Sequence, residues 1–110
     1  AYKGLEPREV WRHFAALNQI PRPSGHEEKA RDYVRQIARE CGATTQEDSA
    51  GNIVVRVAGN NASTHMVAIQ SHLDMVCEKR PDVQHDFASD AIVPRREGDK
   101  IYASGTTLGA

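Results

Sequence analysis

The 110-residue sequence is poor in several features, and each scarcity excludes a class of protein. It has only 2 cysteines, Cys41 and Cys77, which are too few for a disulfide scaffold or a zinc ribbon. We therefore expect both to be free thiols. No run approaches the roughly 18 apolar residues that a membrane-spanning helix needs. A formal net charge of -1 gives no electrostatic case for binding nucleic acid or an anionic membrane.

What is present is the composition of an ordinary soluble protein, with 39% hydrophobic and 26% charged residues. A chain of 110 residues can form one domain at most, which is large enough for a core but short for a complete α/β enzyme. Its first residues lack the charged and then apolar pattern of a signal peptide. We therefore expect a fragment of a cytoplasmic protein.

Two helices are predicted near the start of the chain. Pro7 suits the first position of a helix over residues 7–17, which has an apolar stripe at helical spacing. The stripe consists of Val10, Trp11, Phe14 and Leu17. A second helix is expected over residues 26–41, because Ser24 and Glu27 match a capping box and Gly42 suits the left-handed residue that ends a helix.

Short strands are expected after the helices, which places the chain in the α/β class. They are predicted at residues 44–47, 53–57, 66–70, 91–93 and 100–103. A polar loop separates 53–57 from 66–70, so we expect these two strands to pair antiparallel. A turn at residues 97–99 should join the last two strands as a hairpin.

The most informative stretch runs from Met66 to Asp74. Its apolar first half predicts a buried strand, which leads directly into the sequence Ser71-His72-Leu73-Asp74. In open α/β sheets ligands bind beyond the carboxyl ends of the strands, so His72 is well placed to hold a metal or move a proton. With one residue between them, Asp74 can orient the imidazole of His72, as carboxylates do at zinc sites.

Plainer interpretations of these residues stand beside the functional one. A His-x-Asp pair by itself is a weak pattern, and most such pairs are surface polar residues. The pair His85-Asp86 lies in a polar loop and is better interpreted as solvated. Cys77, five residues after His72, could act as a nucleophile with that histidine, but nothing nearby marks an activated thiolate.

Three segments together resemble the aminoacyl-histidine dipeptidases, also called cytosol non-specific dipeptidases, of the di-zinc peptidase superfamily. They are IPRPSGHEEKA at residues 20–30, SHLDMVCEK at 71–79 and GTTLGA at 105–110. The resemblance covers nearly the whole chain. It implies that residues 1–110 are the N-terminal portion of a three-layer α/β/α catalytic domain with a mixed sheet.

The resemblance also implies roles for two residues. His72 corresponds to a zinc ligand, and Asp74 corresponds to the catalytic carboxylate that orients it. In the family, an Asp that bridges two zinc ions follows Leu-Gly-Ala at once, so we expect Asp directly after Ala110. The general-base Glu, the other ligands and the lid or dimerisation domain would lie beyond this chain. The isolated 110 residues should then bind zinc weakly and hydrolyse no dipeptide.

The function implied for the full-length parent is hydrolysis of dipeptides, including those with C-terminal His, by water activated at zinc. The resemblance also implies two zinc ions per site, a small dipeptide substrate and a cytoplasmic location. The full-length parent could be a homodimer. Alternatives are another amidohydrolase or deacylase of the superfamily, a Cys77-dependent hydrolase, and a non-catalytic α/β module.

Overall fold

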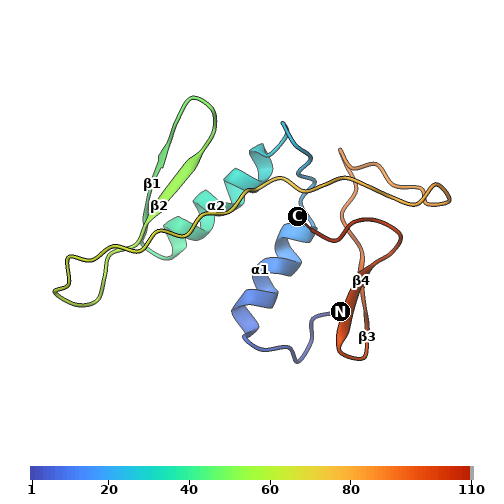
Figure 1. Ribbon diagram of the computed structural model, residues 1–110, viewed down its shortest axis with the longest axis horizontal. Coiled ribbons are helices and arrows are strands. Elements are labelled where there is room, and N and C mark those ends of the chain that lie inside the picture. The colour runs from blue at the N-terminus through green and yellow to red at the C-terminus, as the bar shows by residue number, and fades with distance from the viewer. Residues whose placement is uncertain (110) are drawn as a thin grey trace. The chain divides into compact units, whose positions relative to one another are not determined.

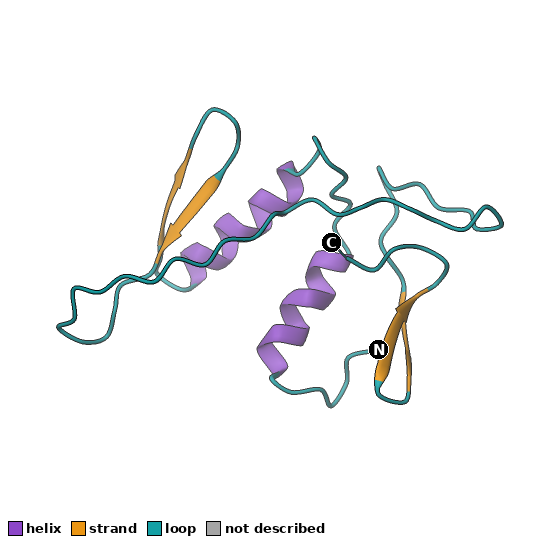
Figure 2. Cartoon of the chain, viewed as in Figure 1, coloured by secondary structure: helices purple, strands orange, loops and turns teal. Residues whose placement is uncertain are grey.

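The computed structural model describes residues 1–109 as two compact units (Figure 1). The terminal unit consists of Ala1–Ala30 and Leu73–Ala110, and the central unit is Arg31–His72. The elements in chain order are α1 (Arg8–Asn18), α2 (Glu28–Glu40), β1 (Thr44–Glu47), β2 (Ile53–Arg56), β3 (Pro94–Glu97) and β4 (Lys100–Ala103). Figure 2 shows the long loop that joins β2 to β3. No helix in the described part of the chain has the length and hydropathy of a membrane span.

In the terminal unit, α1 packs through an aromatic cluster. The rings of Tyr2, Trp11 and Phe14 lie 5.8–5.9 Å apart, with Phe14 edge-on to the other two. The helix begins within one residue of its predicted start. The prediction that Val10 belongs to the core-facing apolar stripe was wrong, since Val10 is 59% exposed.

Asn18, at the end of α1, joins three parts of the terminal unit. Its side chain is buried and donates a hydrogen bond to the Tyr2 hydroxyl at 3.0 Å. Its backbone carbonyl accepts from the amide of Ile92 at 2.9 Å, and Ile92 is itself buried. This bond explains why the C-terminal hairpin begins later than expected, at Pro94 rather than at residue 91. The amide of Ile92 is already bonded to α1 and does not join a strand ladder.

The hairpin of β3 and β4 forms around the predicted turn, where Gly98 has a φ of 61°. Its register pairs Pro94 with Ala103 and Glu97 with Lys100. Arg95 and Tyr102 face each other across the strands, and the guanidinium lies 4.9 Å from the ring centre. A cation over an aromatic face adds to the stability of such a cross-strand pair.

The Gly-rich stretch near the C-terminus is bonded along the segment that follows Asp74. The amide of Arg80 donates to the carbonyl of Gly105 at 2.9 Å. The amide of Thr107 donates to the backbone carbonyl of Glu78, also at 2.9 Å. The Thr107 hydroxyl also donates to the carbonyl of Val76 at 2.5 Å. The second and third segments of the motif set are thus held side by side, except for Ala110, which lies outside the described residues.

Gly105 should be the glycine most sensitive to substitution. Its φ is +84°, and a β-carbon there would clash with Cγ2 of Val83. Left-handed backbone costs a residue with a β-carbon about 1–2 kcal/mol, and overpacking adds about 1–3 kcal/mol. We expect Gly105→Ala to lower the free energy of unfolding of the chain by about 2–4 kcal/mol, measured by urea unfolding with the fluorescence of Trp11.

Gly98→Ala is the matched control for this prediction. Gly98 also has a positive φ, of +61°, but a β-carbon added there would meet nothing within 4 Å. It should therefore show only the backbone cost of about 1–2 kcal/mol. Equal losses in the two variants would show that Val83 gives way without cost.

In the central unit, helix α2 ends as predicted at Gly42. The glycine has a φ of 69°, its amide bonds to the carbonyl of Arg39, and the amide of Ala43 bonds to that of Ala38 at 2.8 Å. This is the Schellman arrangement, which satisfies carbonyls that the last turn would otherwise leave unpaired. The predicted end was one residue beyond the observed Glu40.

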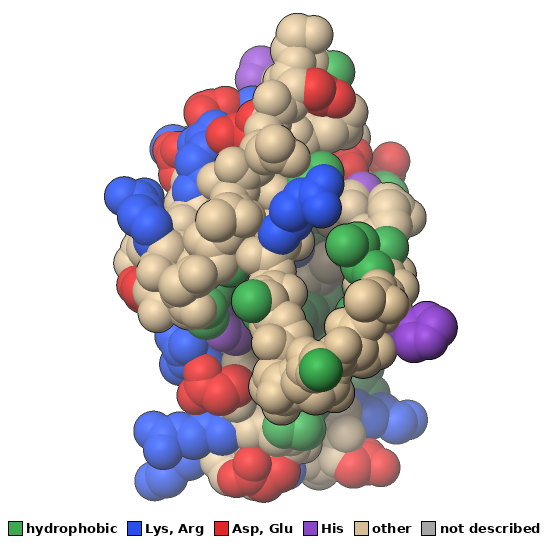
Figure 3. Space-filling model, turned by 90° about the vertical axis from the view of Figure 1, so that its left-hand side faces the viewer, with side chains coloured by type: hydrophobic (Ala, Val, Ile, Leu, Met, Phe, Trp, Pro, Cys, Tyr) green, Lys and Arg blue, Asp and Glu red, His purple; other side chains and the backbone are tan. Residues whose placement is uncertain are grey.

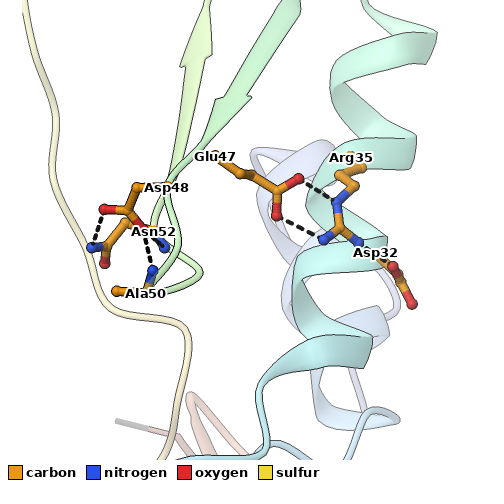
Figure 4. A network of polar contacts seen from close by, with 6 residues as sticks. All are labelled: Asp32, Arg35, Glu47, Asp48, Ala50 and Asn52. Atoms are coloured by element: carbon orange, nitrogen blue, oxygen red, sulfur yellow. Dashed lines mark hydrogen bonds and ion pairs between the residues drawn. The ribbon is translucent and has the colours of Figure 1, made fainter.

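Strands β1 and β2 form an antiparallel hairpin that is attached to α2 (Figure 4). The Arg35 guanidinium makes two hydrogen bonds to the Glu47 carboxylate, at 2.8 and 2.7 Å, and also contacts Asp32. Paired bonds of this kind fix geometry as well as charge, so they position the hairpin on the helix. The predicted partner of β2 was wrong, because β2 pairs with β1 and not with residues 66–70.

The turn between β1 and β2 is built on the Asp48 carboxylate. It accepts the amides of Ala50 and Asn52 at 3.0 and 2.9 Å, and the Asn52 side chain at 2.8 Å (Figure 4). These hydrogen bonds hold the pKa of Asp48 below its ordinary value of 3.8, and the bond from the Asn52 side chain has the largest effect. A lowered folded-state pKa means that this stabilisation is present above pH 3.8 and is lost as the pH falls through the folded pKa.

An NMR pH titration of the Ala50 and Asn52 amides should therefore show a midpoint below pH 3.8. Asn52→Ala removes the largest cause and should move the midpoint upward. A midpoint at or above 3.8 in the unchanged chain would contradict this role of Asp48.

Residues 66–70 do not form the predicted buried strand. They are extended but unpaired, and Met66, Val67 and Ile69 are 80%, 86% and 94% exposed. A strand needs a neighbour for its backbone groups, and the described residues supply none to this run. Figure 3 shows the face of the molecule that lies on the left in Figure 1, where hydrophobic side chains lie at the surface beside charged ones.

Candidate metal site around His72 and Asp74

Asp74 is held by a contact from a distant segment of the chain. Its side chain is half-buried, and one carboxylate oxygen, Oδ2, accepts a hydrogen bond from the Ser24 hydroxyl. The two backbones are joined at the same place: the amide of Met75 donates to the carbonyl of Arg22 at 3.1 Å, and Pro23 and Met75 form a parallel bridge. The first and second segments of the motif set therefore meet at Asp74.

Sequence reasoning missed this role of Ser24. The predicted capping box was wrong, because the Ser24 hydroxyl donates to Asp74 and the Glu27 carboxylate accepts from the amide of Gly25 at 2.7 Å. Helix α2 begins only at Glu28. The available signal was Pro21 and Pro23, which keep this segment extended and able to lie along another chain segment.

Arg22 places a buried positive charge in the same region. Its side chain is 7% exposed, and Nη1 has no hydrogen-bond partner among the described residues. Burial lowers the pKa of the guanidinium, while the ionised forms of Cys77 and Asp74 oppose that shift. The charge of Arg22 therefore lies close enough to interact with the Asp74 carboxylate.

Cys77 lacks the features of an activated nucleophile. Burial raises the pKa of its thiol; Arg22 acts in the opposite direction, and the charges of Asp74 and Glu78 raise the pKa further. The Sγ atom lies 3.4 Å from the carbonyl of Met75, to which a protonated thiol can donate. A raised pKa leaves little thiolate at neutral pH, so these contacts disfavour a Cys77-dependent hydrolase.

His72 is the last residue of the central unit, and its side chain is exposed. No group of 3 or more His, Cys, Asp or Glu side chains in residues 1–109 is arranged to hold a metal ion. The donor types nevertheless fit zinc, since imidazole nitrogen and carboxylate oxygen are among its usual ligands.

The second candidate pair, His85-Asp86, is structural. The His85 ring is half-buried, with its centre 4.5 Å from that of Phe87. Asp86 organises the turn that follows, because its carboxylate accepts the amide of Ala88 and its own amide donates to Asp90. The expectation of a solvated pair was correct for Asp86, which is exposed, but not for His85.

Comparison with known proteins shows what the chain is similar to. No family model matches the chain. The cytosol non-specific dipeptidase of Escherichia coli (strain K12) is 41% identical over 108 residues, which is 96% of this chain and 22% of that protein. The crystal structure of the aminoacylhistidine dipeptidase from Vibrio alginolyticus superposes with a TM-score of 0.90 at 36% identity, over 99% of this chain and 23% of the other.

Over nearly its whole length the chain is similar to these two dipeptidases in sequence and in fold. It spans about a fifth of the length of the relatives that it matches. The α/β class is confirmed, and the described residues contribute two antiparallel strand pairs to it. The N-carbamoyl-L-amino acid amidohydrolase of Geobacillus stearothermophilus is also similar, 32% identical over 82 residues, or 66% of this chain and 20% of that protein.

Proposed function

We propose that residues 1–110 are the N-terminal portion of the catalytic domain of a zinc-dependent dipeptidase. In this proposal His72 binds zinc and Asp74 is the carboxylate that orients its imidazole. The full-length enzyme would be cytosolic, would bind two zinc ions per site and would hydrolyse small dipeptides, including those with C-terminal His. A homodimer fits the dimerisation domain that the family resemblance implies.

The observation that carries the proposal is the environment of Asp74. The Asp74 carboxylate accepts a hydrogen bond from the hydroxyl of Ser24, 50 residues away in sequence, and interacts with the charge of the buried Arg22 guanidinium. A carboxylate on a solvated surface loop makes no such contacts with distant residues. The hydrogen bond from Ser24 holds the carboxylate in one orientation. A fixed orientation is needed by a group that accepts the second N–H of a metal-binding histidine.

The chemistry divides between the chain and the metal. Bound zinc would lower the pKa of a water molecule from about 15.7 toward 7 and so supply hydroxide at neutral pH. The residues of this chain would hold the zinc ion and orient its histidine ligand. Asp74 fixes the tautomer of His72, so that the other ring nitrogen presents its lone pair.

A second candidate function is hydrolysis of N-carbamoyl amino acids. The observation that favours it is the similarity to the amidohydrolase from Geobacillus stearothermophilus. Both reactions break an amide-type C–N bond, so the same residues in this chain would serve either. Dipeptidase activity is the better supported of the two, because the dipeptidase relative matches more of the chain at higher identity.

Substrate profiling of a full-length enzyme that carries these 110 residues would test the proposal. Dipeptides, including Xaa-His, should be hydrolysed much faster than N-carbamoyl or N-acyl amino acids. A chelator should abolish the activity and zinc should restore it. Turnover restricted to N-carbamoyl substrates would select the second candidate, and activity that resists chelation but is lost on thiol alkylation would overturn both.

A further inference from the structure

Residues 22–24 lie along residues 74–75 as a short parallel partner. The contact consists of the bond from the Met75 amide to the Arg22 carbonyl, at 3.1 Å, and the bridge between Pro23 and Met75. Pro23 has no amide hydrogen and disfavours a helical conformation at Arg22. The local sequence therefore keeps the segment extended, with its carbonyl free to accept from Met75.

This arrangement delivers the Ser24 hydroxyl to the Asp74 carboxylate. The final side-chain torsion of an aspartate is soft, so without a fixed donor its two oxygens sample a wide range of orientations. A hydrogen bond to Oδ2 restricts that torsion and so sets the direction of the whole carboxylate group. Ser24 itself is exposed, which means that packing does not require a hydroxyl at this position.

We propose that Ser24 is a positioning residue for the metal site: its hydroxyl orients the Asp74 carboxylate, and Asp74 in turn orients His72. The inference rests on the proposed zinc site and assigns one more residue to it. It is specific to the hydroxyl group, since the backbone bridge at Pro23 and Met75 would survive the loss of that group.

The test compares three variants of a full-length dipeptidase that carries this segment. Zinc affinity is measured by competition with a chromogenic chelator, and kcat and KM are measured on a dipeptide. Outer partners of a metal-binding histidine typically contribute about 10- to 100-fold, so Ser24→Ala should weaken zinc binding by about 10-fold. It should lower kcat similarly and leave KM nearly unchanged. Ser24→Thr keeps the hydroxyl and should restore both values to within about twofold.

Ser104→Ala is the matched control. Ser104 is also an exposed serine of the terminal unit, but its hydroxyl donates to the carbonyl of Val93 rather than to a carboxylate. The same chemical change there should leave zinc affinity and kcat at the unsubstituted values. Loss of affinity in this control to the same extent would show that the effect of Ser24→Ala is a general loss of stability.

A double-substitution cycle shows whether Ser24 acts through Asp74. In an Asp74→Ala background, Ser24→Ala should have no further effect on zinc affinity, because the group it orients is gone. An undiminished 10-fold effect in that background, or no effect of Ser24→Ala alone, would overturn the inference. Failure of the proposed zinc site is a separate result: zinc affinity would then be insensitive to His72→Ala as well, and the role of Ser24 would fall with it.

Discussion

His72→Ala should remove one metal ion and nearly all turnover from a full-length dipeptidase that carries this segment. Catalytic zinc typically has three protein ligands and a water molecule, so loss of one ligand leaves an incomplete site. A catalytic metal contributes several kcal/mol to transition-state stabilisation, and about 1.4 kcal/mol corresponds to tenfold in rate. We expect kcat to fall by about 1,000-fold or more. Metal analysis and the dipeptide hydrolysis rate are the two measurements.

His65→Ala is the control for this substitution. His65 is an exposed histidine of the same central unit, and its amide is bonded to the Ser63 hydroxyl, a contact that does not involve its ring. It should retain both the zinc content and the turnover of the unsubstituted enzyme. Full activity in His72→Ala would show that His72 is not a ligand, and the proposed site would have to be abandoned.

Asp74→Ala should have the second-largest effect. The variant keeps the zinc ligand but loses the group that fixes its tautomer and orientation, so we expect zinc affinity and kcat to fall by about 10- to 100-fold. Asp74→Asn separates charge from geometry. Its amide oxygen can still accept from Ser24, but it lacks the negative charge that strengthens a hydrogen bond to the imidazole.

The expected order of zinc affinity is therefore unsubstituted enzyme, then Asp74→Asn, then Asp74→Ala, with His72→Ala weakest. The order is measured by chelator competition on all four proteins. An Asp74→Ala variant that binds zinc as tightly as the unsubstituted enzyme would mean that Asp74 does not act on His72. The hydrogen bond from Ser24 would then have only a structural role.

Elements with local signals could be predicted from the sequence. The end of α2 follows from Gly42, whose left-handed φ of 69° few other residues adopt easily. The hairpin turn at Gly98 and the turn before β2 follow from the same kind of chemistry. In each case the residues that determine the conformation are neighbours in the sequence, so one pattern contains the information.

Elements that depend on distant partners could not be predicted. Residues 66–70 have the composition of a buried strand, but a strand also needs a neighbour, and none pairs with them in the described chain. The start of β3 at Pro94 depends on a bond from Ile92 to Asn18, and periodicity contains no trace of it. The composition of a segment shows that it is apolar enough to be buried, but whether it is buried depends on contacts with the rest of the fold.

Some residues around the candidate site could likewise be predicted from the sequence, and others could not. His72 and Asp74 stand out because they are close in sequence and follow an apolar run. Ser24 and Arg22 do not, because they are about 50 residues away and Ser24 fits a helix cap equally well. The contact between residues 22–24 and Met75 became visible only in the structure.

The most direct test of the zinc site is a crystal structure of a full-length dipeptidase that carries this segment, grown with zinc and measured at the zinc absorption edge. We predict an anomalous peak about 2.0–2.1 Å from one ring nitrogen of His72, with the other ring nitrogen donating to the Asp74 carboxylate. Zinc bound elsewhere in the protein, with the imidazole of His72 pointing away from it, would contradict the proposed site.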